Sequence, residues 1–290
     1  MTTYSLGQNV TLDTSAVDDN GDPIDATLVL TATKPDGTSI TPEVSHIGDP
    51  GSGDYAATFV VDQVNSWSWV WVASGAITAS SFGQFDVQDP PAPAYAELAE
   101  LKEGLGLTAN DRDARLASLL LRSSRAIEDA CGKRKFWLDP VPVVRTFNPR
   151  DRIINDADGQ RFLVDDIGST FGLAVAIGMG STFTTMDSAQ YQTGPDSALV
   201  KGDPITALIR PSGIWNLVRG QQLQVTARWG YPSIPGPISE ATLLLANRRY
   251  KRRSSPEGVY GSAEWGVIRV SRSDPDVLEM IETYQLFGTG

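Results

Sequence analysis

A short proline-rich segment at residues 89–93 (DPPAP) divides this chain into two parts of very different charge. Residues 1–94 contain twelve acidic side chains and one basic side chain, Lys34, so their net charge is −11. Residues 95–290 contain twenty-three acidic and twenty-three basic side chains, so their net charge is zero. Closely spaced prolines favour a stiff, extended backbone. The sequence therefore predicts one domain at 1–88, a linker at 89–94 and a second domain at 95–290.

Residues 1–88 have the pattern of short strands separated by evenly spaced turns, which is typical of an all-β sandwich. The segments DDNGDP (18–23) and KPDGT (34–38) carry the glycine and proline signals of tight turns. The acidic turn at 18–23 also offers oxygen ligands for calcium. Because it lacks the distal glutamate and the loop length of an EF-hand, we expect a plain hairpin turn there.

Three tryptophans, Trp67, Trp69 and Trp71, recur at every second residue of one predicted strand. Alternate residues of a strand point to the same face of its sheet, so the three rings share a face. This face is either part of the core or an exposed stripe that stacks on sugars. The residues between them are mostly apolar as well, which favours a central strand and a buried face.

Several motifs of the first domain together resemble the immunoglobulin-like domains often appended to phage virion proteins. They are the turn before a threonine-rich strand, KPDGT, GSGDYAATF and the closing WSWVWVASGAITASSFGQFDV. The cysteine pair of antibody domains is missing. The resemblance thus implies the sandwich architecture and says little about a ligand.

The second domain reads as helices around a long β insertion, an α+β arrangement. Apolar residues at helical spacing predict helices at 95–106, 110–131, 237–253 and 275–287, with the β insertion at 136–230. Thr108 with Asp111 resembles a capping box for the second helix, and Gly132 supplies its end. Cys131 falls on the apolar stripe of that helix, so we expect a buried, inert thiol.

The sequence offers few groups for catalysis or metal binding. A single cysteine excludes an internal disulfide and a cysteine-rich zinc site, and suits a reducing cytoplasm. His46 is the one histidine, which excludes H-E-x-x-H metal sites. Asp165 and Asp166 are neighbours on a predicted strand, so they point to opposite faces and do not form a catalytic dyad. We predict no catalytic, cofactor-binding or metal site, and no enzymatic activity.

Two glycine-containing segments could suggest a ligand site. GMGSTF (178–183) lacks the third glycine of a dinucleotide fingerprint and is followed by β-forming residues. NDADGQ (155–160) lacks the downstream glutamate of a calcium loop. We therefore expect both segments to be turns.

The segment NRRYKRR (247–253) concentrates positive charge at the end of the third predicted helix. Leu243, Ala246 and Tyr250 share one face of this helix. Cations at a helix C-terminus are favoured by the helix dipole, but one or two suffice for that. The segment has five cations, and three interpretations of them stay open: docking to a partner protein, contact with DNA phosphates, or a solvated helix end. The candidate contact residues are Arg248, Arg249, Lys251, Arg252 and Arg253.

The order of motifs after the prolines resembles the head-to-tail connector, or adaptor, proteins of long-tailed bacteriophages. The resemblance covers residues 95–290 and rests on LKEGLGL, DARLASLLLRSSRAIEDACGKRKF, VTARWGYPSIPGPISEATLLLANRRYKRR and VIRVSRSDPDVLEMIETYQ. It implies a non-enzymatic ring, usually dodecameric, that docks below the portal protein and extends the DNA channel. It also implies a platform for the next connector, stopper or tail protein.

The same resemblance implies a C-terminal segment that reaches a partner, with Tyr284, Leu286 and Phe287 as candidate contacts. It places the protein in the virion, at the head–tail interface, after synthesis in the cytoplasm of a bacterial host. Double-stranded DNA would pass without sequence-specific contact. No apolar run is long enough to span a membrane. The chain departs from the family in its N-terminal sandwich and its long β insertion.

A second interpretation is a non-enzymatic protein that binds carbohydrates or surfaces through the strand carrying Trp67, Trp69 and Trp71. It requires that these rings be exposed. The absence of a secretion signal and of disulfides counts against it.

Overall fold

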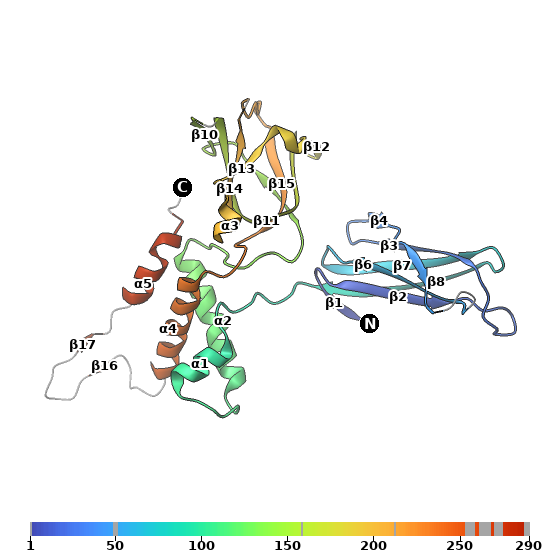
Figure 1. The fold of residues 1–290 in the computed structure, drawn as a ribbon, viewed down its shortest axis with the longest axis horizontal. Coiled ribbons are helices and arrows are strands. Elements are labelled where there is room, and N and C mark those ends of the chain that lie inside the picture. The colour runs from blue at the N-terminus through green and yellow to red at the C-terminus, as the bar shows by residue number, and fades with distance from the viewer. Residues whose placement is uncertain are drawn as a thin grey trace. The chain divides into compact units, whose positions relative to one another are not determined.

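The computed structural model describes residues 2–48, 52–157, 159–211, 213–252, 259–260, 268–269 and 275–286. The chain divides into two compact units, Met1–Pro91 and Ala92–Gly290 (Figure 1). The border between them lies within the proline-rich segment. Among the described helices, none combines the length and the apolar character needed to cross a membrane.

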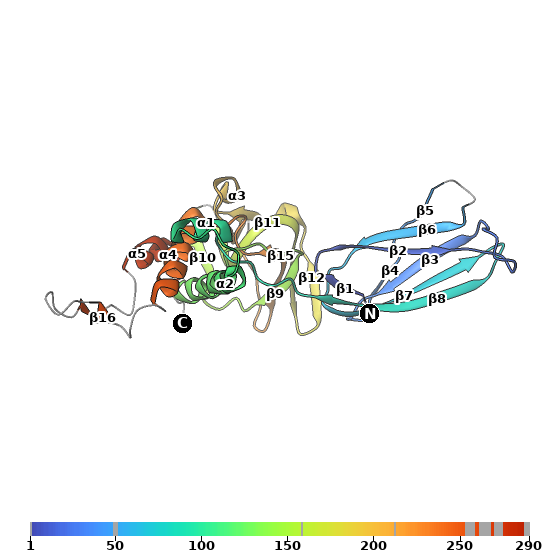
Figure 2. The same cartoon turned by 90° about the horizontal axis from the view of Figure 1, so that it is seen from below.

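The first unit consists of two β sheets, which Figure 2 shows as two layers. The larger sheet has the order β1-β8-β7-β3-β4, in which β1 pairs with β8 in parallel and the other pairs are antiparallel. The smaller sheet has the order β2-β6-β5 and is antiparallel. The strands are β1 (Thr3–Ser5), β2 (Asn9–Ser15), β3 (Thr27–Thr33), β4 (Ser39–Ile40), β5 (Val44–His46), β6 (Asp54–Val60), β7 (Asn65–Ser74) and β8 (Ala79–Gln88).

The core of this unit lies between the two sheets. Trp67 and Trp71 of β7 are buried, and Trp69 is half-buried against the same core. The ring of Phe59, from the smaller sheet, stacks on Trp67 at a centroid distance of 5.9 Å. The core interpretation of the tryptophans is thus confirmed, and the exposed aromatic stripe is wrong. The all-β prediction is confirmed too, whereas the immunoglobulin-like character stays a prediction.

The second unit contains helices and a β insertion between α2 and α4. The helices are α1 (Leu98–Leu105), α2 (Asp113–Ala130), α3 (Ala198–Lys201), α4 (Gly236–Arg252) and α5 (Pro275–Ile281), with short 3-10 turns η1 (Ser188–Gln190) and η2 (Glu282–Tyr284). The strands are β9 (Val143–Phe147), β10 (Ile153–Asp156), β11 (Gly159–Met179), β12 (Thr182–Thr185), β13 (Gln192–Gly194), β14 (Ile205–Arg210), β15 (Gln222–Trp229), β16 (Val259–Tyr260) and β17 (Ile268–Arg269).

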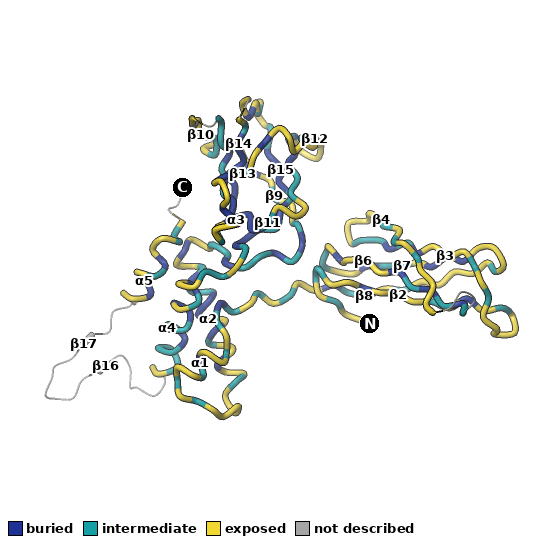
Figure 3. Tube along the Cα trace, viewed as in Figure 1, coloured by how far each residue is buried: buried dark blue, intermediate teal, exposed yellow. Residues whose placement is uncertain are grey.

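The long strand β11 organises the insertion. Its first part pairs with β14 and its last part with β15, and β9 pairs with β15 at the edge of the sheet. Buried aliphatic and aromatic residues, among them Phe162, Val225 and Trp229, form its core. Figure 3 shows buried stretches along β11 and β14. The GMGSTF segment is the turn between β11 and β12, as predicted. In NDADGQ, residue 158 lies outside the described residues.

The start of α2 differs from the prediction. The helix begins at Asp113, its N-cap is Arg112, and no side chain caps it, so the capping box of Thr108 and Asp111 is wrong. The reason is a contact from the preceding helix. Lys102 of α1 binds Asn110 at 2.6 Å and Asp113 at 2.8 Å, which holds residues 110–113 in a turn. A capping box instead forms one helix earlier, between Glu97 and Glu100 of α1.

The helices share two small cores. One gathers Leu101 of α1, Leu116 and Leu120 of α2 and Ala246 of α4. The other includes Ile127, Cys131, Ile238 and Ile281. Cys131 is buried as expected, and burial raises the pKa of its thiol to about 11. The fourth predicted helix is shorter than expected, because α5 ends at Ile281 and continues as the 3-10 turn η2.

Candidate functional site

The C-terminal end of α4 carries the basic residues that the sequence singled out. The helix packs against α1, α2 and α5. Ala246 is fully buried, and Leu243 and Tyr250 pack against the same small core, so the predicted apolar face is confirmed. The basic side chains at this end of α4 therefore lie beside the line of contact between α2 and α4.

Tyr250 anchors the helix end to the start of α2. Nη1 of Arg112 donates a hydrogen bond of 2.7 Å to the Tyr250 hydroxyl oxygen. This bond favours the charged form of the guanidinium and raises the pKa of Arg112. The contact joins residues 138 positions apart and positions the basic segment.

Arg248 and Arg249 link α4 to neighbouring helices. Arg248 lies 3.1 Å from the carboxylate of Asp276 and so links α4 to α5. Nη1 of Arg249 donates to the buried hydroxyl of Ser123 in α2 at 3.3 Å. Burial, followed by the positive charges of Arg252 and Arg122, lowers the pKa of Arg249. The predicted cluster thus separates into residues that join helices and residues that face solvent.

The solvent-facing part consists of Lys251 and Arg252, both exposed at the last turn of α4. Arg122 of α2 is exposed and close enough to influence Arg249 electrostatically. Arg253 lies outside the described residues. Together Arg122, Lys251 and Arg252 form a positively charged surface from two helices, called the basic surface, which suits an anionic partner.

The three predicted C-terminal contacts have different surroundings. The Tyr284 ring is half-buried and packs edge-on against Phe136 at 5.7 Å, so it belongs to the helical core. Leu286 is 51% exposed, and its backbone N–H donates to the carbonyl of Cys131. Phe287 lies outside the described residues. Of the two described residues, Leu286 is the one available to a partner.

A cleft of about 660 Å³ lies between the segment after α2 and the sheet of the insertion. Arg134 forms two hydrogen bonds with Asp166, at 2.6 and 2.8 Å. Asp165 instead accepts a hydrogen bond of 2.7 Å from Arg145. The two neighbouring aspartates thus take different partners, but both line this one cleft, because the pairing of β11 shifts register between Leu163 and Ile167; the predicted placement on opposite faces is not seen. Their role here is to form ion pairs.

Acidic side chains in the first unit serve its turns. The carboxylate of Asp18 accepts hydrogen bonds from the backbone N–H groups of Asp22 and Asn20, which lowers its pKa. Gly21 has a positive φ of 87° in this turn, as a tight turn requires. Among the described residues, no group of three or more His, Cys, Asp or Glu side chains gathers where it could hold a metal ion.

Sequence reasoning missed the contribution of α2 to the basic surface. Arg112 and Arg122 were part of a helix whose apolar stripe carried the prediction. Arg112 precedes Leu116 by four residues and so lies on the helix side that meets α4, which was a usable signal. Arg122 has no such spacing, and only the packing of α2 against α4 brings it near Arg249.

Comparison with known proteins gives a limited answer. No family model matches the chain, and no curated protein matches it. A chain of the native gene transfer agent virion is 18% identical, with 69% of this chain and 96% of that chain covered and a TM-score of 0.40. A chain of the native gene transfer agent neck, computed with C12 symmetry, is 16% identical, with 69% and 97% covered and a TM-score of 0.37.

A candidate glycoside hydrolase from Bacteroides vulgatus is 20% identical over 31% of this chain, with a TM-score of 0.25. This chain spans only 17% of that protein's length. TM-scores of this size do not establish a shared fold.

The structure itself defines a class: a two-unit protein in which an acidic β unit precedes a helical unit with a β insertion.

Proposed function

We propose that this protein is a structural component of a virion neck, a head-to-tail adaptor that forms a ring below the portal. In this role the ring extends the DNA channel and gives a platform to the next connector, stopper or tail protein. The protein acts by assembly and catalyses no reaction.

The observation that supports this proposal most is the arrangement of the second unit. The sequence motifs that resemble the adaptor family fall on α1, α2, α4 and the C-terminal segment with α5. These helices share two cores, although α2 and α4 are separated by the whole insertion. A helical scaffold of this kind can place the same surface once per subunit around a ring.

The basic surface at the end of α4 is the proposed docking surface for a partner protein. Arg248 and Arg249 hold α4 against α5 and α2, so they fix the position of the segment. Lys251 and Arg252 then face outward. An acidic surface on the neighbouring ring would complement them, and a ring would repeat the contact with each subunit.

Electron microscopy tests the assembly. The purified chain, alone and mixed with the portal protein of its phage, should form rings that attach to the portal. A chain that stays monomeric and never binds portal would refute the proposal.

A charge-reversal variant tests the docking surface. Lys251→Glu/Arg252→Glu should abolish attachment to portal-bearing heads and leave the rings themselves intact, because both side chains point away from the helical cores. The single variant Lys201→Glu changes an exposed cation on α3 and serves as the control. Normal attachment of the double variant would exclude α4 as the docking surface.

A further inference from the structure

The cleft of about 660 Å³ beside Arg134, which we call the arginine cleft, has an excess of positive charge. Five cationic side chains and three carboxylates line it, a net charge of +2. Arg134 pairs with Asp166, and Lys135 pairs with Asp139. Lys133 is exposed and forms no ion pair within the described residues. The cleft therefore offers cations that its own carboxylates do not neutralise.

Two guanidinium groups of the cleft converge on one point. Nη1 of Arg145 lies 2.7 Å from Oδ2 of Asp165, and Nη1 of Arg152 lies 3.7 Å from Oδ1 of the same carboxylate. The arginine side chains are 38% and 37% exposed, so a group from outside can reach them. One carboxylate balances only one of the two charges. A second carboxylate would fit here, because guanidinium groups bind carboxylates through several donors.

Both guanidinium groups are held in place by the sheet of the insertion. Arg145 lies over the ring of Trp229 at 4.5 Å, and Arg152 lies over the ring of Phe147 at 4.9 Å. Both rings are buried. Arg152 also donates to the carbonyl oxygen of Leu163 at 3.2 Å. Little side-chain freedom is therefore lost when an anion binds.

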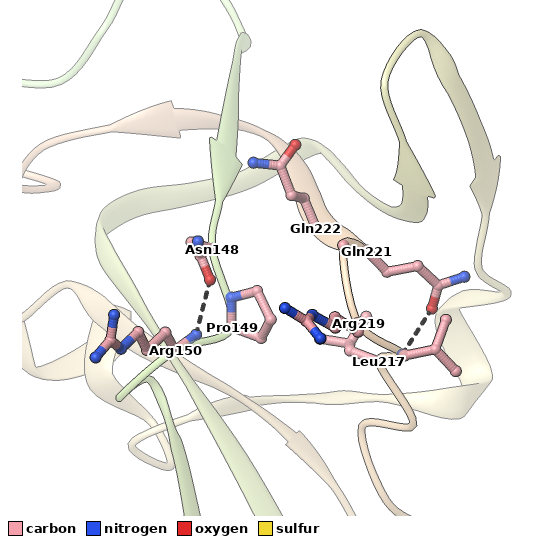
Figure 4. Close-up of a pocket in the computed structure, with 9 residues that line it drawn as sticks. Asn148, Pro149, Arg150, Leu217, Arg219, Gln221 and Gln222 are labelled. Atoms are coloured by element: carbon pink, nitrogen blue, oxygen red, sulfur yellow. Dashed lines mark hydrogen bonds between the residues drawn. The ribbon is translucent and has the colours of Figure 1, made fainter.

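A smaller pocket of the insertion lacks such convergence. It has a volume of about 390 Å³ and lies between residues 148–150 and 217–222 (Figure 4). Arg150 and Arg219 both line it, but Figure 4 shows the guanidinium group of Arg150 pointing away from the pocket and from Arg219. The arginine cleft is thus the better site for an anionic group.

The first unit displays carboxylates on a preformed turn, residues 18–25, which we call the acidic turn. Asp19, Asp22 and Asp25 are exposed, and none of them forms an ion pair within the described residues. The carboxylate of Asp18 instead accepts the backbone N–H groups of Asn20 and Asp22 and so fixes the shape of the turn. The turn therefore presents three carboxylates to a positively charged surface.

The acidic turn and the linker lie at opposite ends of the first unit. The turn leads into Thr27, which is paired with Ser74 at the end of β7. From there β8 runs back to Gln88 and the prolines. Ten residues of strand span about 33 Å. Because the turn is this far from the linker, another copy of the chain can reach it without the first unit folding back.

We propose that the arginine cleft of one copy binds the acidic turn of a neighbouring copy. The two surfaces have opposite charges, which favours their association. A contact between unlike surfaces of successive copies forms a ring when the rotation closes. The inference thus deepens the proposed function by assigning the contact between subunits; only the closing into a ring rests on that function.

Exchange of the charges tests the contact, with self-association measured by sedimentation velocity at low salt. Asp19→Lys/Asp22→Lys and Lys133→Glu/Arg152→Glu should each weaken self-association at least about tenfold, because like charges then meet. The chain carrying all four substitutions should regain it. Glu43→Lys/Asp89→Lys makes the same charge change at exposed positions elsewhere and should keep it. Circular dichroism checks folding, and Lys133→Glu alone, at an exposed position, should act in the same direction.

An equal mixture of the two reversed variants separates a contact between copies from one within a chain. In the mixture each turn meets a cleft of opposite charge, so association should return, whereas a contact within one chain gains nothing from mixing. A monomeric unaltered chain, an equal loss in the control, or no recovery in the mixture overturns the inference. Rings that form despite both reversals would refute this contact alone. Recovery of association without attachment to portal would instead refute the adaptor proposal.

Discussion

At the scale of single residues, Gly83 shows how tightly the first unit is built. It lies on β8 directly opposite Trp69 on β7. A Cβ atom at Gly83 would lie 2.5 Å from a carbon of the Trp69 ring. The half-buried ring of Trp69 therefore occupies the space that a side chain at position 83 would need.

Gly83→Ala should destabilise the first unit by about 1–3 kcal/mol, since the indole must move out of a packed position. Gly104→Ala is the matched control. Position 104 lies in α1 with no atom within 4 Å of its would-be Cβ, so alanine should stabilise that helix by about 0.5–1 kcal/mol. Urea titrations followed by tryptophan fluorescence and circular dichroism measure both changes. A neutral Gly83→Ala would contradict the packing.

Asp36 gives the first unit a pH dependence. Hydrogen bonds from the Thr38 side chain and then the Gln63 side chain lower the pKa of this carboxyl group from 3.8 to about 2. Because the folded-state pKa is the lower one, the stabilisation is complete above about pH 4. It is lost as the pH falls towards about 2.

Asp36→Asn should therefore lower the urea midpoint of the first unit at neutral pH, and the difference from the unaltered protein should vanish near pH 2. Urea titrations across this range measure it. A difference that stays constant with pH would mean that the charge of Asp36 has no part in the turn.

At the scale of elements, one ion pair joins the end of α2 to the sheet. The side chains of Arg134 and Asp166 are only 12% and 11% exposed. Arg134 also donates to the carbonyl oxygen of Tyr284 and lies over the ring of Tyr231 at 5.0 Å. Three segments distant in sequence thus converge on one guanidinium.

Asp166→Ala should destabilise the second unit by about 3–5 kcal/mol, because it leaves this guanidinium buried without its counter-charge. The double variant Arg134→Met/Asp166→Ala should cost less than the sum of the two single variants. Denaturation of the four proteins in a double-mutant cycle gives the coupling. Strict additivity would show that the pair does not couple these elements.

The elements also show what a local pattern can predict. The apolar stripes of α1, α2 and α4 follow from spacing along the chain, and Leu101, Leu116 and Ala246 are buried as that spacing requires. The first residue of α2 could not be predicted from the local sequence, because Lys102 of another helix binds Asp113 there. The end of α5 is likewise set by Tyr284, whose ring packs against Phe136 and Tyr231.

At the scale of the whole molecule, charge and core are divided in the same way. The first unit holds its own core between two sheets and carries the entire net charge of −11. The second unit holds separate cores and is neutral overall. Self-repulsion of like charges destabilises a compact state and is screened by salt.

The fragments 1–91 and 92–290 should therefore each fold and unfold in a separate transition. Salt should raise the melting temperature of 1–91 and change that of 92–290 much less. Calorimetry of the fragments and of the whole chain at low and high salt tests this. A single transition of the whole chain with no counterpart in the fragments would contradict the independence of the units.

By itself the sequence determined the charge partition at the prolines, the alternation of Trp67 and Trp71, and the apolar face of α4, because each is a local period or composition. Only the tertiary structure decided that Arg248 and Arg249 join helices while Lys251 and Arg252 face outward. It also brought Asp166 and Tyr284 to the guanidinium group of Arg134. Those pairings depend on the register of strands and helices far apart in the chain, which no local pattern contains.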